Sequence, residues 1–175
     1  MEKNATVDRS KALSVIGIDR NRFSYLFRFG HDGDAGDKLL QTEFTEPLPG
    51  EAAKLTRENC LEIAFIDRFA SAGVLLPIAS RRAIELLKLE REGNLPRWWI
   101  RPWHRGTFPS KDGLLFDDGE AGLGLLARRM APTMGAMIDG KPPCRSDPIE
   151  ATRIYAENLA EIVRMIDGLF ADEGQ

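Results

Sequence analysis

Arginine and asparagine side chains gather in one short stretch, residues 20–29, which holds three arginines and no acid. An arginine can bond both acceptors of a guanine, and an asparagine can pair in the same way with an adenine. If the stretch is a helix, Arg20, Asn21 and Arg22 stand at its N-terminal end, where a helix in the major groove meets the bases. Tyr25 and Arg28 lie further along, where phosphate contacts are expected.

A helix-turn-helix is expected around these residues. Ser10 is a suitable cap for a first helix, and Gly17 ends that helix. Asp19 then caps the second helix, residues 20–29, which Gly30 ends. Apolar side chains follow at spacings of three and four, so one face of the second helix is expected to be buried. These are Phe23, Leu26 and Phe27.

Two further helices follow a loop-like segment. Residues 38–44 alternate apolar and polar side chains and predict a short strand within residues 31–50. Thr56 opens a third helix with a broad apolar face, and Gly73 ends it. Pro77 suits the first turn of a fourth helix, which runs to about Glu92.

The second half of the chain changes in character after residue 93. All three tryptophans fall in residues 97–105, and residues 97–118 predict a hairpin or a small sheet, with Pro102 restricting it to an edge or a bulge. Residues 121–130 suit a short helix. A long final helix is predicted from Asp147, with Pro148 in its first position and Glu150 completing a capping box. Its apolar stripe, which ends at Phe170, must pack on the protein or on a second chain.

The composition indicates a folded, soluble protein. Of 175 residues, 43% are hydrophobic and 29% are charged, which is enough apolar material for a core. No apolar run approaches the roughly 18 residues that cross a bilayer. The two cysteines, Cys60 and Cys144, are far apart, and Cys60 lies in an apolar stretch, so a buried reduced thiol is expected. We therefore expect a cytoplasmic protein.

Residues 12–25 (ALSVIGIDRNRFSY) resemble the first helix, turn and recognition helix of MerR-type transcriptional regulators. Residues 54–61 (KLTRENCL) are similar to that family's segment leading out of the wing into a capped helix. Residues 65–69 and 72–74 resemble the end of this helix and the break before the next one. The resemblance covers about residues 10–90, and the order and spacing of elements carry it.

The resemblance implies a winged helix-turn-helix that binds double-stranded DNA in a sequence-specific way. Lys38, Lys54 and Arg57 would add phosphate contacts from the wing and the next helix. The resemblance also implies a homodimer, for which residues 147–170 are the natural interface. Two features depart from the family. The loop after the recognition helix is long and acidic, and residues 52–54 (AAK) stand where the usual wing tip has Gly-Tyr-Arg.

Other chemistries fit the residues less well. The loop at residues 31–37 carries Asp32, Asp34 and Asp37, but their spacing does not match a calcium loop, so no metal is expected. No nucleophile, phosphate-loop or dinucleotide motif is present, so neither an enzyme nor a cofactor is expected, and a small enzyme using His104 is the weakest alternative. The tryptophan- and arginine-rich stretch could stack bases, bind a protein or anchor a core.

The sequence thus predicts a mostly α protein of the α+β class. Residues 1–92 form the MerR-like winged helix-turn-helix, and residues 93–175 form a hairpin-plus-helix unit for dimerisation or interaction. The leading function is sequence-specific transcriptional regulation through recognition helix 20–29. The alternative is a protein-interaction adaptor or antiactivator that keeps the fold without binding DNA, which the net charge of −3 and the acidic loop favour.

Overall fold

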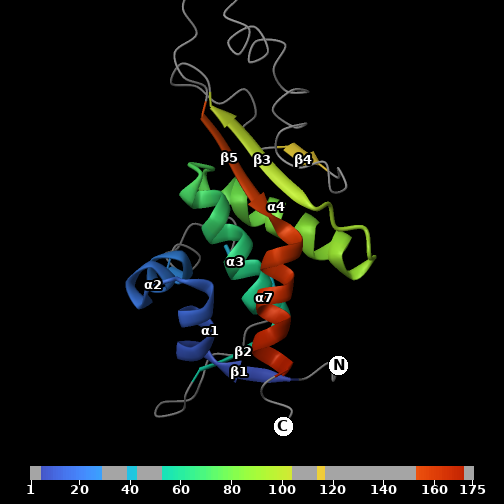
Figure 1. The fold of residues 1–175 in the computed structure, drawn as a ribbon. Coiled ribbons are helices and arrows are strands. Elements are labelled where there is room, and N and C mark those ends of the chain that lie inside the picture. The colour runs from blue at the N-terminus through green and yellow to red at the C-terminus, as the bar shows by residue number, and fades with distance from the viewer. Residues whose placement is uncertain (1–4, 29–38, 43–52, 104–113, 117–152, 172–175) are drawn as a thin grey trace, which may run out of the picture. The chain divides into compact units, whose positions relative to one another are not determined.

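Helices predominate in the computed structural model, which describes residues 5–28, 39–42, 53–103, 114–116 and 153–171 (Figure 1). The mostly helical α+β class that the sequence predicts is confirmed. The elements, in chain order, are β1 (Thr6–Asp8), α1 (Arg9–Ile16), α2 (Arg20–Arg28), β2 (Lys54–Thr56), α3 (Arg57–Ser71), α4 (Leu76–Arg91), β3 (Trp98–Trp103), β4 (Leu114–Phe116), β5 (Arg153–Asn158) and α7 (Leu159–Ala171).

The chain divides into two units. Unit 1 comprises residues 1–95 and 158–175, and unit 2 comprises residues 96–157. The first boundary lies close to residue 93, as the sequence suggests, but the final helix falls in unit 1 and not in the C-terminal unit. The reason is its packing, because α7 lies against α3, α1 and β1. Unit 2 is therefore inserted between α4 and α7.

Local sequence signals set most helix ends in unit 1. Gly17 adopts a left-handed conformation with φ 84° at the end of α1, a conformation that glycine reaches without a steric penalty. Thr56 begins α3 with a reciprocal capping box, in which its side chain accepts from the Asn59 backbone and the Asn59 side chain accepts from Thr56 N. Pro77 lies in the first turn of α4. The first helix begins two residues earlier than expected, since Asp8 is its N-terminal flanking residue and Ser10 lies inside it.

The core of unit 1 surrounds α3. Residues 59–67 of this helix are all buried, so α3 has neighbours on most of its circumference. It packs most extensively on α4, and α7 and α1 cover other sides (Figure 1). The largest side chains in this core are fully buried and apolar, among them Ile16, Leu61, Ile63, Phe65, Ile66, Phe69, Leu86 and Leu87. Burial of this many large side chains is the main stabilising contribution to the unit.

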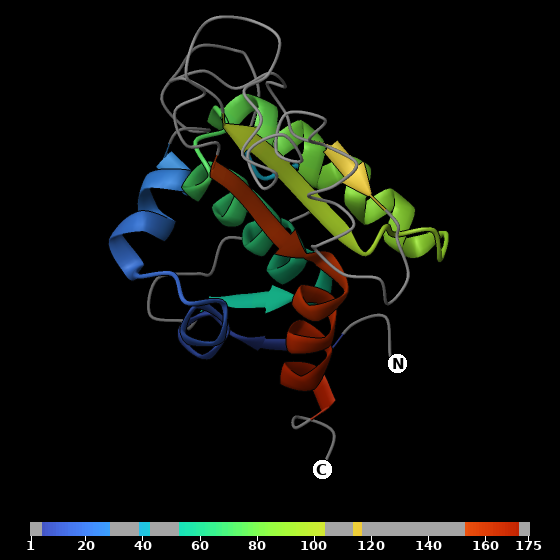
Figure 2. The same ribbon diagram turned by 45° about the horizontal axis from the view of Figure 1, so that its top comes forward.

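Strands β1 and β2 pair antiparallel and bring the chain start beside the segment that enters α3. The register places Val7 opposite Leu55 and Asp8 opposite Lys54. Figure 2 shows the two strands next to α7. The sequence did not predict β1, because three residues with one apolar side chain carry no periodic signal. At residues 39–42, where a strand was predicted, the described chain forms a bend, and the remainder of residues 38–44 lies outside the described part.

Unit 2 contains a three-stranded sheet of order β4-β3-β5. Strands β3 and β4 are antiparallel, with Trp99 opposite Leu115, which confirms the expected small sheet. Pro102 lies in the central strand and not at an edge. The register described between β3 and β4 runs from Trp98 to Ile100 and does not include Pro102.

The final helix is shorter than the sequence predicts. Residues 153–158 form β5, and α7 begins only at Leu159. Asn158 acts as its cap, since Asn158 Oδ1 accepts a hydrogen bond from Glu161 N at 3.2 Å. The predicted cap at residues 147–150 and the predicted helix at 121–130 lie outside the described residues. None of the described helices combines the length and the apolar character needed to cross a membrane.

Candidate nucleic-acid interface

A tight turn at residues 17–19 joins α1 to α2. Gly17 N bonds to Leu13 O at 2.9 Å, and the next residue, Ile18, is buried beneath the turn. Asp19 then caps α2, because its Oδ1 accepts a hydrogen bond from Arg22 N at 2.8 Å. The two short helices around a tight turn and the Asp19 cap are therefore as predicted. Together they fix where the first turn of α2 begins.

The inner side of α2 is held by an aromatic anchor. Phe23 is buried, and the guanidinium of Arg9 on α1 lies over its ring, 5.7 Å from the centroid. This contact is a cation–π interaction between the two helices. Arg20 and Asn21, which precede Phe23 in the first turn of α2, are exposed. The first turn of α2 thus presents a cation and an amide to solvent while Phe23 faces the core.

Arg22 is also exposed, at 41% of its side chain, but its guanidinium is bonded to α3. Its Nε donates to Asp67 Oδ1, and its Nη2 donates to Ser71 Oγ at 2.9 Å and to Asp67 O at 3.4 Å. Asp67 is buried, and the ion pair is partly shielded from water. The sequence places Arg22 among the base-contacting residues, whereas in the structure it joins two helices of the same chain.

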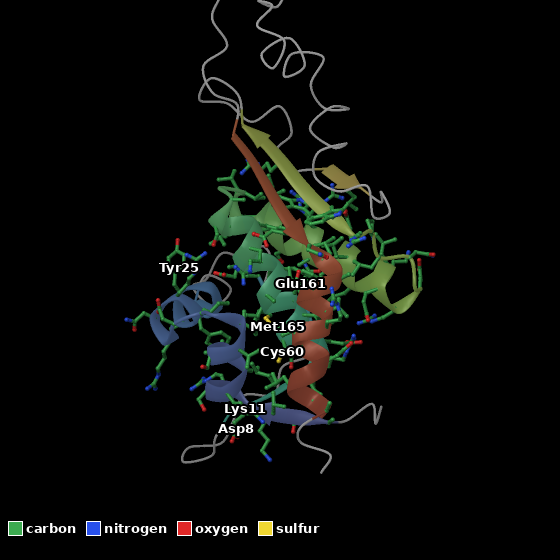
Figure 3. All side chains as sticks on the ribbon, in the orientation of Figure 1. Asp8, Lys11, Tyr25, Cys60, Glu161 and Met165 are labelled. Carbon is green, nitrogen blue, oxygen red and sulfur yellow. The ribbon has the colours of Figure 1, made fainter. Side chains whose placement is uncertain are left out.

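The remaining predicted contacts of α2 are only partly described. Tyr25 is 56% exposed on α2 and is labelled in Figure 3. Arg28 is the last residue of that helix, and its side chain is not described. Lys38 lies outside the described residues, as does most of the expected wing. Lys54 is exposed on β2, opposite Asp8 of β1. Of the predicted set, Arg20, Asn21, Arg22 and Tyr25 are exposed on α2, and Arg22 among them is bonded to α3.

Arg57, the other predicted phosphate contact, is held in an ion-pair network inside unit 1. Its Nη2 donates to Glu90 Oε1 of α4 at 2.8 Å, and its Nε donates to Asp167 Oδ1 of α7 at 2.5 Å. The hydrogen bond to Glu90 is the main cause that raises the pKa of the Arg57 guanidinium, against the opposing effect of burial. Arg57 therefore connects three helices, and its donors are directed at carboxylates of the same chain.

A buried polar cluster that the sequence analysis did not single out fixes residues 39–42. The Glu62 carboxylate, 0% exposed, accepts hydrogen bonds from Gln41 N at 2.7 Å, from Thr42 N at 3.0 Å and from Thr42 Oγ. Asn59 Nδ2 donates to Thr42 Oγ at 2.8 Å, and Ser80 Oγ donates to the Leu39 carbonyl. A buried carboxylate must find such donors.

The sequence does contain a signal for this cluster. Glu62 and Asp67 are the acids inside the apolar run of residues 60–69 (CLEIAFIDRF). Acidic residues on the buried side of a helix need partners, so both positions mark long-range contacts. Asp67 receives Arg22 from α2, and Glu62 receives the segment that follows α2 along the chain. The partners themselves are not predictable from local patterns.

In unit 2, Trp99 is completely buried and Arg101 is 5% exposed. The guanidinium of Arg97 lies 5.9 Å from the centroid of the Trp98 ring. Burial of Trp99 favours the core-anchoring interpretation of this stretch over base stacking. The third tryptophan, Trp103, ends β3, and its side chain is not described.

Metal and redox chemistry find no support in the described part of the chain. No group of three or more His, Cys, Asp and Glu side chains there is arranged to hold a metal ion. The acidic loop 31–37, His104 and Cys144 lie outside the described residues. Cys60 is a free thiol inside the helical core (Figure 3), and its burial raises its pKa to about 12, which leaves the thiol protonated and unreactive at neutral pH.

Comparison with known proteins adds no assignment: no protein-family model matches the chain, and no curated protein matches its sequence.

Proposed function

We propose that unit 1 is a sequence-specific DNA-binding module of a transcriptional regulator, with the first turn of α2 in the major groove. The observation that carries the proposal is the division of α2 into two sides. Phe23 and Arg22 fasten one side to α1 and α3, while Arg20 and Asn21 are exposed at the N-terminal end. A recognition helix needs this combination of a fixed inner side and free polar groups at its start.

The order of elements supports the same proposal. The helix pair α1–α2, the strand β2 and the helix pair α3–α4 follow one another in the order that the resemblance to MerR-type regulators implies. Arg20 is suited to a guanine and Asn21 to an adenine, and Lys54 on β2 is suited to a phosphate. A role on DNA also agrees with the cytoplasmic location expected from the sequence.

A homodimer remains part of the expectation for a regulator that reads palindromic sites, but its interface must be sought away from the apolar stripe of α7. The apolar residues of that stripe are buried within unit 1, including Leu159, Ile162, Ile166, Leu169 and Phe170. A surface already covered by α3 and α1 is not free to pair with a second copy.

Selection from a pool of randomised DNA duplexes tests the proposal, followed by fluorescence anisotropy on the enriched duplex. We expect Arg20→Ala and Asn21→Ala each to weaken binding about 10- to 100-fold and to relax the preference for one base pair. Lys54→Ala should lower affinity for all sequences and reduce the salt slope by about one.

Lys88→Ala on α4 is the matched control, because it removes one exposed charge from unit 1 outside α2. Enrichment of no duplex, or equal losses in the Arg20 and Lys88 variants, would refute the proposal.

The second candidate is a protein-interaction adaptor, which one observation favours. Arg22 and Arg57, two of the predicted DNA-contacting cations, are engaged with carboxylates of the same chain. Tyr25 and Leu75 are large side chains that are mostly exposed and could meet a protein partner. The salt titration separates the two candidates, since the steep loss of affinity that accompanies counterion release is expected only for DNA.

A further inference from the structure

The contacts of Arg22 join the start of α2 to the end of α3. Asp67 and Ser71 are four residues apart on α3, so they lie one turn apart on one face of that helix. Arg22 reaches both of them, with Nε on Asp67 Oδ1 and Nη2 on Ser71 Oγ at 2.9 Å. The planar guanidinium therefore bridges two side chains that start one helical turn apart on α3, which restricts both the position and the rotation of α2.

The electrostatics favour the same arrangement. Arg22 Nη2 also donates to the Asp67 carbonyl at 3.4 Å, close to the C-terminal end of α3. A cation near the C-terminal turn interacts favourably with the helix dipole. Asp67 is 7% exposed, and a carboxylate that is so shielded from water needs hydrogen-bond donors or a charged partner, which Arg22 supplies. Reading a base would require Arg22 to give up these bonds and leave Asp67 without that partner.

Arg22 is therefore separated in role from the residues beside it. Arg20 and Asn21 are exposed and precede it in the same turn of α2. Their direction depends on how α2 is rotated about its axis, because adjacent helical residues are about 100° apart. A change of rotation at Arg22 is passed directly to both side chains.

We propose that Asp67 and Ser71 are positioning residues for DNA recognition, which act through Arg22 to fix the direction of Arg20 and Asn21. The inference rests on the proposed DNA-binding function. It assigns base readout to Arg20 and Asn21 and removes Arg22 from that set. Fixing α2 before binding lowers the ordering cost of association, as preorganisation does in general.

A comparison of base preference with affinity tests the inference. The variants are Arg22→Ala, Asp67→Asn, Ser71→Ala and the double variant Arg22→Ala/Asp67→Asn, with Arg20→Ala for comparison. We expect Arg22→Ala and Asp67→Asn each to weaken binding of the enriched duplex about tenfold. Both should keep the wild-type base preference at every position, whereas Arg20→Ala should lose it at one.

The double variant measures whether the effects of Arg22 and Asp67 on DNA affinity are coupled. If Asp67 acts through Arg22, the double variant binds no more weakly than Arg22→Ala alone. The charge reversal Arg22→Asp/Asp67→Arg should regain part of the affinity that either reversed single variant loses. A residue that stabilised the fold without orienting α2 would lower the urea midpoint without this coupling in DNA affinity.

Hydrogen exchange of the free protein provides a readout that does not depend on DNA. We expect the α2 amides to exchange faster in Asp67→Asn than in the wild type, with the α4 amides unchanged. Relaxed preference at one base pair in Arg22→Ala, additive losses in the double variant, or unchanged exchange in α2 would each overturn the inference. Failure of the wild type to enrich any duplex would instead refute the proposed function, and the exchange comparison would still decide whether Asp67 orients α2.

Discussion

Arg57 Nε donates a 2.5 Å hydrogen bond to Asp167 Oδ1, which lies 110 residues further along the chain. Arg57 is the first residue of α3, and Asp167 lies in α7, on the far side of the whole of unit 2 in sequence. The bond shows that the C-terminal helix completes the N-terminal fold. Because Arg57 also binds Glu90 of α4, one guanidinium connects the consecutive helices α3 and α4 to the distant helix α7.

Replacing Arg57 with Ala is expected to lower the free energy of unfolding by about 2 kcal/mol. The loss arises because Glu90 and Asp167 would keep their charges without the partner between them. Part exposure of both acids keeps the loss below that of a fully buried pair. Urea denaturation followed by circular dichroism measures it. Arg164→Ala is the control, since Arg164 is exposed on α7, and a similar loss in both variants would contradict the network.

Glu62→Ala is expected to cost about 3 kcal/mol of stability, because Gln41 N and Thr42 N would lose their buried acceptor. Glu62→Gln keeps an acceptor oxygen and should cost less. Both losses should appear in the urea midpoint, and amide exchange at residues 41–42 should rise in the alanine variant. Glu92→Ala, at an exposed position, is the matched control. Equal midpoints for the Glu62 and Glu92 variants would show that the carboxylate does not hold the segment.

The helix ends of unit 1 were predictable because their causes are local. Gly17, Asp19, Thr56 and Pro77 each act within one turn of the residue that they affect. The start of α7 was not predicted, although Asn158 and Glu161 have the spacing of a helix cap. The signal at Asp147 was locally stronger, but residues 153–158 pair with β3 instead. Strand pairing is non-local, so a helix-compatible stretch can be taken into a sheet by its partner.

The residues of the candidate interface were likewise predictable only where their placement has a local cause. That Arg20 and Asn21 stand exposed at the start of α2 follows from the Asp19 cap and the buried Phe23. The ion pairs of Arg22 and Arg57 do not follow, because their acceptors lie 45 and 110 residues away. A free arginine and one engaged in an ion pair look alike in sequence, and only the buried acids in the apolar run of α3 indicate that partners must come from elsewhere in the chain.

Cys60 makes the free energy of unfolding depend on pH in the alkaline range. Burial raises its folded-state pKa to about 12, whereas an unfolded cysteine ionises near about pH 8.5. The contribution of the Cys60 thiol to stability is complete below its unfolded-state pKa. It is lost as the pH rises toward 12, because only the unfolded chain then gains free energy by ionising the thiol. The free energy of unfolding should fall by at most about 1.4 kcal/mol per pH unit from this group.

The difference between the wild type and Cys60→Ala isolates that contribution, since lysines and tyrosines titrate in both proteins. We expect the two pH profiles to run parallel below about pH 8 and to converge above about pH 9. A thiol reagent at pH 8 should label Cys60 only as fast as the protein opens. Rapid labelling of the folded protein at residue 60 would contradict the burial.

Ile166→Ala distinguishes a core role of α7 from a dimer role. Ile166 is fully buried, and α7 packs on α3 and α1 of its own chain. Truncation should therefore create a cavity and lower the free energy of unfolding by about 3 kcal/mol at any protein concentration. The molar mass from light scattering should match the wild type, and Ala160→Ser on the exposed side should change neither quantity. An interface role would give the opposite pattern, with a mass that falls to the monomer and a stability that depends on concentration.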